Sequence, residues 1–174
     1  MFIIEPMNIA EQSKQYAIGC HRETNHLYDN KPYEVHLKLV VGAAERFIHL
    51  IPEEARLEVV AGCWVHDCIE DCRQTYNDVK KATSEAVAEL AYALTNEKGR
   101  NRQERASDKY YADMKATPYA VFVKYCDRIA NVTYAKQQGS RMYEVYHKEV
   151  EHFIAKIHQE PYDEMAAHLR SLFE

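Results

Sequence analysis

The sequence predicts an all-α fold, and three observations support this prediction. Glycine and proline number only five each in 174 residues, which is few for a loop-rich β protein and suits long helices. Apolar residues recur at steps of three and four, the spacing of one helix face. The sequence also lacks the strong alternation of a half-buried strand. We therefore expect one domain over residues 1–174, a bundle of about eight helices.

The first half of the chain is predicted to form three long helices and a short one. Residues 7–28 form the first, and Pro32 suits the first turn of a second that continues to about residue 50. Pro52 opens the third, and a short helix at 76–79 follows a turn. The apolar faces of the long helices are Ile9, Ala10, Tyr16, Ala17 and Cys20; Val35, Leu39, Val40, Ala43, Ala44 and Phe47; and Leu57, Val60, Ala61 and Trp64.

The second half is predicted to contain five more helices. Thr83 or Ser84 suits the N-cap of the first of them, and Pro118 and Gly139 suit the start and the end of the third. The expected helices are 84–94, 103–115, 118–139, 141–158 and 161–173, with a polar, basic loop at 95–102.

Charge and cysteine content argue against several classes of protein. The formal net charge of −5 disfavours binding to a nucleic-acid backbone. Residues 1–4 are apolar but too few for a signal peptide, and we expect no later membrane span. Five cysteines without a Cys-x-x-Cys pair indicate reduced thiols in a cytoplasmic protein. Cys63, Cys68 and Cys72 turn only partly to one side of a helix, which favours buried packing over a zinc site.

An acidic cluster lies at the end of the third predicted helix. His66 and Asp67 are about 100° apart on a helix, so both can reach one metal ion from the same side. Glu70 and Asp71 follow them by one turn. Without a cation the three carboxylates would repel one another, and the C-terminal end of a helix disfavours acids. We therefore expect a divalent metal here rather than a solvated acidic helix end.

A second polar group lies in the apolar helix predicted at 118–139. Asp127 and Asn131 are one turn apart on one face, and Lys124 lies one turn before Asp127. Burying Asp127 without a partner would be costly. Two interpretations stay open from these residues alone: a salt bridge with Lys124 or Arg128, or a further ligand for the metal.

Three spaced motifs resemble those of the HD phosphohydrolase superfamily. They are Lys31-Pro32-Tyr33-Glu34-Val35-His36, Val65-His66-Asp67-Cys68-Ile69-Glu70-Asp71 and Val123-Lys124-Tyr125-Cys126-Asp127-Arg128-Ile129-Ala130-Asn131. They are similar to the family's Glu-Pro-Tyr-Ile-x-His, Leu-His-Asp-x-x-Glu-Asp and Val-Lys-Leu-Ala-Asp-Arg-Leu-x-Asn. Over residues 7–160 the chain resembles the hydrolase domain of SpoT-type enzymes and small alarmone hydrolases, which remove the 3′-pyrophosphate of ppGpp using manganese.

The resemblance implies an HD-type helical bundle and assigns roles to the motif residues. The implied ligands of one Mn²⁺ are His36, His66, Asp67 and Asp127. Mixed nitrogen and oxygen donors would also suit Fe²⁺, Co²⁺ or Zn²⁺. Glu70 and Asp71 would orient a water molecule and take its proton. Lys124 and Asn131 would contact a phosphorylated nucleotide substrate. His36 alone is more typical of a satisfied core histidine, so its role rests on the resemblance. A homo-oligomer is compatible with the sequence.

The stretch ahead of Pro32 departs from the family. Where the family has an Arg-Lys-Ser-Gly run that helps hold the nucleotide, this chain has residues 27–30, Leu-Tyr-Asp-Asn. The alternatives are therefore another HD nucleotidase or phosphatase, acting on a 5′-nucleotide or a 3′-phosphonucleotide, and a non-catalytic nucleotide-binding module. Candidate phosphate contacts from the loops, each more typical of solvated surface charge, are Arg22, Lys98, Arg100, Arg102 and Arg105.

Overall fold

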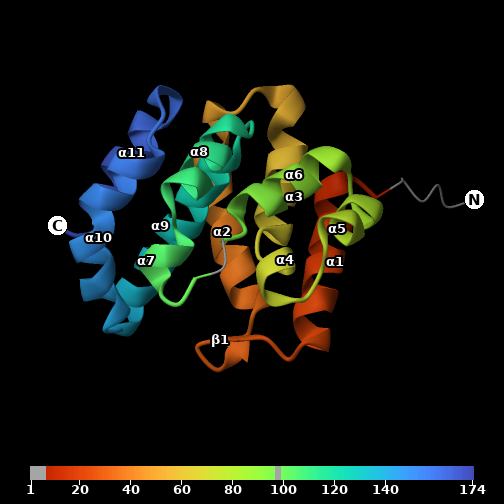
Figure 1. The fold of residues 1–174 in the computed structure, drawn as a ribbon, viewed down its shortest axis with the longest axis horizontal. Coiled ribbons are helices and arrows are strands. Elements are labelled where there is room, and N and C mark those ends of the chain that lie inside the picture. The colour runs from red at the N-terminus through yellow and green to blue at the C-terminus, as the bar shows by residue number, and fades with distance from the viewer. Residues whose placement is uncertain (1–6, 97–98) are drawn as a thin grey trace, which may run out of the picture.

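The computed structural model describes residues 7–96 and 99–174, and nearly all of their regular secondary structure is helical (Figure 1). The predicted all-α class is therefore confirmed. The helices are α1 (Ile9–Glu23), α2 (Glu34–Phe47), α3 (Arg56–Val65), α4 (Cys68–Asp71), α5 (Tyr76–Ala82), α6 (Glu85–Leu94), α7 (Arg102–Arg105), α8 (Asp108–Ala116), α9 (Ala120–Gln138), α10 (Met142–Ile157) and α11 (Asp163–Ser171). Three single turns of 3₁₀ helix are η1 (Ile48–Leu50), η2 (Glu53–Ala55) and η3 (Glu160–Tyr162).

The core forms where α3 packs against α1, α2 and α6, and where α2 packs against α9. Figure 1 shows α10 and α11 at one end of this assembly and α1 and α5 at the other. The largest fully buried side chains include Tyr125 and Phe122 of α9 and Leu37 and Phe47 of α2. The first of the three sequence motifs ends in α2, the second spans α3 and α4, and the third lies in α9. Packing among these helices therefore brings the motifs together.

The first predicted helix ends five residues early, and the remainder forms a hairpin. α1 ends at Glu23, and the antiparallel strands β1 (Leu27–Tyr28) and β2 (Lys31–Pro32) follow. Asp29 and Asn30 join the strands with φ angles of 50° and 61°. Positive φ at both positions is the requirement of a two-residue type I′ turn, which Asn and Asp tolerate best. The segment between the first two predicted helices is therefore a tight hairpin turn.

The third predicted helix is divided near the acidic cluster. α3 ends at Val65, and α4 begins at Cys68, with Asp67 at φ −102° and ψ 0° between them. The predicted apolar face was wrong for Leu57, which is 51% exposed, whereas Val59 is fully buried. Apolar side chains occur on more than one face of this segment, so periodicity alone left its rotation ambiguous.

The later elements follow the prediction closely. The predicted helix 103–115 is divided into α7 and α8, because the Ser107 hydroxyl accepts from the Tyr110 N–H as a new N-cap. The short helix expected at 76–79 extends to Ala82, and Ser84 is the N-cap of α6. The single domain predicted over residues 1–174 includes residues 1–6 and 97–98, which lie outside the described residues, as does the candidate phosphate contact Lys98.

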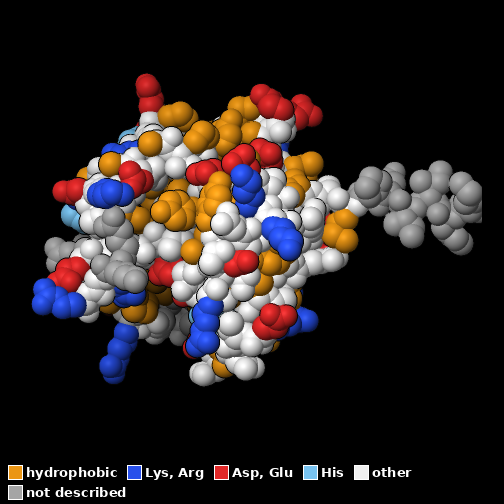
Figure 2. Space-filling model, turned by 45° about the vertical axis from the view of Figure 1, so that its right-hand side comes forward, with side chains coloured by type: hydrophobic (Ala, Val, Ile, Leu, Met, Phe, Trp, Pro, Cys, Tyr) orange, Lys and Arg blue, Asp and Glu red, His pale blue; other side chains and the backbone are white. Residues whose placement is uncertain are grey.

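The surface carries charges of both signs. Acidic and basic side chains lie interspersed on the face drawn in Figure 2. None of the described helices combines the length and the apolar character needed to cross a membrane. The predictions of a cytoplasmic location, of no nucleic-acid partner and of a homo-oligomer stay predictions.

Gly62 allows α3 to approach α6 closely. A Cβ atom at this position would lie 2.5 Å from Leu90 Cδ1 and 3.1 Å from Leu90 Cβ. We expect Gly62→Ala to lower the free energy of unfolding by about 1–3 kcal/mol, because overpacking outweighs the better helix propensity of alanine. Gly42→Ala in α2 is the matched control, since nothing lies within 4 Å of its Cβ position. Chemical denaturation of both variants is the measurement, and equal stability would contradict this account of the α3–α6 contact.

Candidate active site

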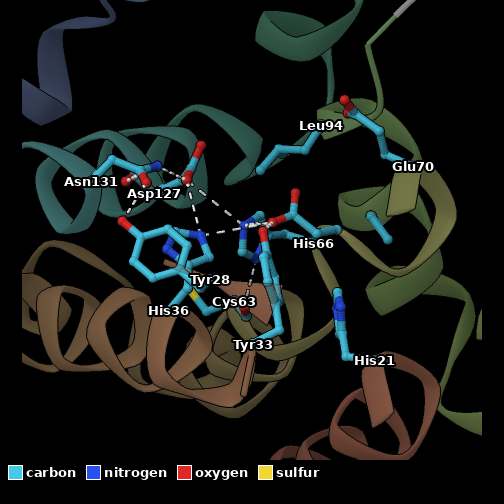
Figure 3. Close-up of polar contacts among 12 residues, drawn as sticks. His21, Tyr28, Tyr33, His36, Cys63, His66, Glu70, Leu94, Asp127 and Asn131 are labelled. Carbon is cyan, nitrogen blue, oxygen red and sulfur yellow. Dashed lines mark hydrogen bonds and ion pairs between the residues drawn. The ribbon is translucent and has the colours of Figure 1, made fainter. Parts of the chain in front are cut away.

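Four side chains from three packed segments meet in one cluster. Figure 3 shows three of them, His36, His66 and Asp127, turned toward one another. His36 lies in the first turn of α2, and His66 follows the last residue of α3. Asp67 is the N-cap residue of α4, and Asp127 lies in the middle of α9. Both histidines are 1% exposed. The four ligands implied by the family resemblance are thus neighbours in space, although α2 and α9 are far apart in the sequence.

The distances among these side chains suit one cation. His66 Nε2 lies 2.9 Å from Asp67 Oδ2 and 3.8 Å from Asp127 Oδ1. His36 Nε2 lies 3.3 Å from Asp127 Oδ1 and 3.7 Å from Asp67 Oδ2. Ligand atoms of His36, His66 and Asp67 are all within 4.8 Å of one another. The ligand atoms of a single metal ion occupy a region of this size.

The His66 ring is oriented for metal binding. Its Nδ1 lies 2.9 Å from the carbonyl oxygen of Cys63, so Nδ1–H donates to that oxygen and Nε2 is turned toward Asp67 and Asp127. His66 Nε2 is buried and makes no hydrogen bond among the described residues. A buried imidazole nitrogen that faces two carboxylates fits a divalent ion that accepts nitrogen and oxygen donors.

Asp127 forms the salt bridge that one interpretation expected, and its other oxygen faces the imidazoles as the second interpretation requires. Its Oδ2 accepts from Lys124 Nζ at 2.9 Å, and its Oδ1 accepts from Asn131 Nδ2 at 2.7 Å while facing both imidazoles. Arg128 is not the salt-bridge partner, because it pairs with Glu149 at 3.0 Å. Lys124 and Asn131 therefore position Asp127, and their predicted contact with substrate stays a prediction.

Two tyrosines complete the cluster, and the motif analysis did not assign them a role. The Tyr33 hydroxyl donates to Asp67 Oδ2. The Tyr28 hydroxyl donates to Asn131 Oδ1 at 2.9 Å, and its ring stacks on His36 with centroids 4.8 Å apart. The Pro-Tyr pair at 32–33 was the available signal for Tyr33. Nothing in the sequence connected Tyr28 with Asn131, 103 residues away.

Opposite charges perturb the ionisation of the cluster. Burial disfavours the His66 cation, but Asp67 and Asp127 outweigh burial and raise the pKa of His66 to about 10. Burial alone would raise the pKa of Asp67, yet the interaction with His66 holds it below its usual range. Burial would also raise the pKa of Asp127, but the positive charge of Lys124 and the two histidines lower it. Without metal the site is therefore an ion-paired network.

Glu70 and Asp71 differ in their relation to the cluster: Asp71 interacts electrostatically with Asp67 and His66, whereas Figure 3 shows Glu70 apart from His66 and Asp127. The Glu70 carboxylate accepts from the backbone N–H of Asn96 at 3.1 Å and from its side-chain amide at 3.2 Å. Asp71 lies at the surface, but the protein atoms around its carboxylate desolvate it. This desolvation, with the charges of Asp67 and Glu70, raises the pKa of Asp71 to about 7. A carboxylate with such a pKa suits proton transfer near neutrality.

A cavity of about 600 Å³ opens beside Glu70. Lys124, which pairs with Asp127 at 2.9 Å, is also part of its wall and connects the cavity to the four-residue cluster. Four cationic side chains face it, together with His152 and three aromatic rings. The lining residues are Glu70, Asn96, Arg105, Ala106, Tyr110, Tyr111, Lys124, Arg128, Lys148, Glu149, His152 and Phe153. Of the candidate phosphate contacts, Arg105 lines this cavity. The guanidinium groups of Arg22 and Arg100 pair instead with carboxylates, those of Glu34 at 2.7 Å and Glu104 at 3.0 Å. The side chain of Arg102 lies outside the described residues.

Comparison with known proteins identifies the fold. One solved structure, described as a metazoan ortholog of SpoT that hydrolyzes ppGpp and plays a role in starvation responses, superposes with a TM-score of 0.75. The match covers 97% of this chain and 95% of that one. The chain has a SpoT-type hydrolase fold. The two sequences are 20% identical, and no protein-family profile matches this sequence. The SpoT-type fold confirms the predicted HD-type bundle.

Proposed function

We propose that this chain is a metal-dependent hydrolase of phosphorylated nucleotides, with removal of a 3′-pyrophosphate as the favoured reaction. The observation that carries the proposal is the adjacency of two features. One is the cluster of His36, His66, Asp67 and Asp127, and the other is the cavity with its four cationic side chains. A phosphate group needs positive charge around its oxygens, and a nucleotide needs a cavity of this size.

The residues of the site have separate roles in metal binding, proton transfer and phosphate binding. A divalent ion such as Mn²⁺, when bound by the four ligands, would polarise a phosphate oxygen and lower the pKa of water. Glu70 and Asp71 orient the attacking water and accept its proton. Lys124, which pairs with Asp127, and Arg105 place positive charge in the wall of the cavity, whereas Arg128 is paired with Glu149. Mixed imidazole and carboxylate donors leave Fe²⁺, Co²⁺ and Zn²⁺ as alternative ions.

The hairpin supports a second candidate substrate, a nucleotide other than a guanine alarmone. Tyr28 donates to Asn131, and Lys31 donates to the Tyr134 hydroxyl, which in turn donates to Asp29. The polar groups of the hairpin are thus engaged by α9 rather than turned toward a ligand. A nucleotide with a different base, or with a 3′-phosphate in place of a 3′-pyrophosphate, would need fewer contacts from the hairpin than a guanine alarmone does.

Turnover with separate product analysis tests the proposal. We would supply Mn²⁺ and compare ppGpp, pppGpp, ppApp, 3′-phosphorylated dinucleotide cofactors and 5′-mononucleotides, measuring pyrophosphate and orthophosphate separately. Pyrophosphate from an alarmone is the expected result. Orthophosphate from another nucleotide would support the second candidate. No release from any of them with Mn²⁺ bound would reject hydrolysis of these substrates and favour the non-catalytic binding module.

The raised pKa of Asp71 gives the reaction a specific pH dependence. A base must be deprotonated to accept a proton, so we expect kcat/KM to fall about tenfold per pH unit below about 7 and to level off above it. Asp71→Asn should lower the plateau and remove this acidic limb. The measurement is a pH profile of kcat/KM for both forms. An acidic limb that persists unchanged in Asp71→Asn would assign it to another group.

A further inference from the structure

A second group of metal-binding side chains lies outside the candidate active site. His21 is in the last turn of α1, His26 precedes β1, and Cys72 follows α4. One ligand atom from each of these residues lies within 4.8 Å of the other two. His21 and Cys72 are each 1% exposed, and His26 is half-buried. None of the three belongs to the sequence motifs that form the first cluster.

The two imidazoles are held in fixed positions. Their Nδ1 atoms lie 2.9 Å apart, and both rings stack on Tyr33, with centroids 4.2 Å and 4.0 Å from its ring. The Nε2 atom of His21 is buried, and no described residue donates to it or accepts from it. An unpartnered buried nitrogen is costly in free energy, and a bound cation would remove this cost.

The third side chain supplies a sulfur donor. The Cys72 sulfur interacts with the Cys68 thiol and the His21 imidazole, and it lies within 4.8 Å of a ring nitrogen of each histidine. Cys68 also interacts with Cys20, and all five cysteines are free. The thiolate is the form of cysteine that binds metals. Two imidazoles and a thiolate make the donor set that Zn²⁺ and Co²⁺ accept in tetrahedral sites, with a fourth position left for water or a neighbouring thiol.

The cluster can be reached from solvent on the imidazole side. A cavity of about 180 Å³ is lined by both histidines, by Tyr33 and by residues of the hairpin. Arg22 and Glu34 at its rim pair with each other at 2.7 Å and so contribute little net charge. Cys72 is buried and is not among the residues that line this cavity, so the imidazoles are the donors open to it.

We propose that His21, His26 and Cys72 form a second metal site, which takes a thiolate-binding divalent cation of the zinc class. This site is distinct from the nitrogen and oxygen cluster of the candidate active site, and it stands whether or not the proposed function is correct. Figure 3 shows Tyr33 between His21 and the first cluster. Because Tyr33 stacks on both imidazoles and donates to Asp67, a cation in the second site would also fix the orientation of an active-site ligand.

Cobalt absorption spectroscopy tests the proposal without reference to catalysis. The full chain, stripped of metal under reducing conditions, would be titrated with Co²⁺. We expect two bound ions and a thiolate-to-cobalt charge-transfer band in the near ultraviolet, which the first cluster cannot produce because it contains no sulfur. Cys72→Ser and His26→Gln should each lose the band and bind one ion. His66→Ala, in contrast, should keep the band.

Matched controls separate the site from general effects on thiols or histidines. Cys126→Ala removes a buried thiol in α9, and His49→Gln removes an exposed imidazole that pairs with Glu164, so the band should survive in both. Absence of the band in the unmodified chain, or its survival in Cys72→Ser or His26→Gln, would overturn the proposal. If Cys72→Ser does not fold, the half-buried His26→Gln still decides the question.

Discussion

Asp67→Ala is expected to remove the metal from the candidate active site and to reduce turnover below detection. Asp67 Oδ2 lies 2.9 Å from His66 Nε2 and 3.7 Å from His36 Nε2, so its carboxylate is central to the ligand group. Its loss leaves two imidazoles and one carboxylate, and it also removes the negative charge that favours a cation there. His66→Ala should have the same effect, because it removes the nitrogen that faces both carboxylates.

Manganese content and turnover measured on the same preparations test this expectation. Asp113→Ala is a suitable control, because this carboxylate lies at the surface of α8 and pairs with Lys109. Circular dichroism would show whether the variants are folded, since Asp67→Ala also removes the charge that raises the pKa of the buried His66. A folded Asp67→Ala protein with normal manganese content would refute the assignment of the four ligands.

Much of the fold could be predicted because its signals are local. Pro118 and Gly139 lie next to the ends of α9, and Gly139 ends it with φ 60°, a conformation that glycine adopts without strain. Pro32 was predicted in the first turn of a helix, but it lies in β2, two residues before α2 begins. The hairpin was missed for a physical reason. Asp29 and Asn30 both adopt positive φ, but neither is followed by the glycine that usually signals such a turn.

The candidate site was predictable only in part. Motif spacing brought together His36, His66, Asp67 and Asp127, since each motif carries its ligand at a fixed position. Contacts between segments were not predictable in this way, as for Tyr33 with Asp67. The grouping of His21, His26 and Cys72 was even less predictable from the sequence, because its members come from three segments and share no periodicity. Considering Cys72 only with its helical neighbours led to the prediction of simple buried packing.

Glu70→Gln is expected to lower kcat by about 10²–10⁴ while leaving the manganese content unchanged, which is the usual effect of losing a general base. The Glu70 carboxylate lines the cavity and accepts two hydrogen bonds from Asn96, and it lies outside the group of four ligands. Glutamine keeps the size of the side chain and one carbonyl oxygen for the Asn96 N–H, but it cannot take a proton from water. The variant therefore separates proton transfer from metal binding.

Kinetics and metal analysis together distinguish the roles of the two carboxylates. Glu89→Gln is the matched control, because Glu89 accepts from the Tyr76 hydroxyl at the surface and should have no effect on kcat. Normal turnover in Glu70→Gln would indicate that Asp71, whose pKa of about 7 suits the role, is the general base instead. A loss of manganese in Glu70→Gln would instead make Glu70 a fifth ligand. The expected result, a slow enzyme with full metal content, is the one that a base beside the metal produces and a ligand does not.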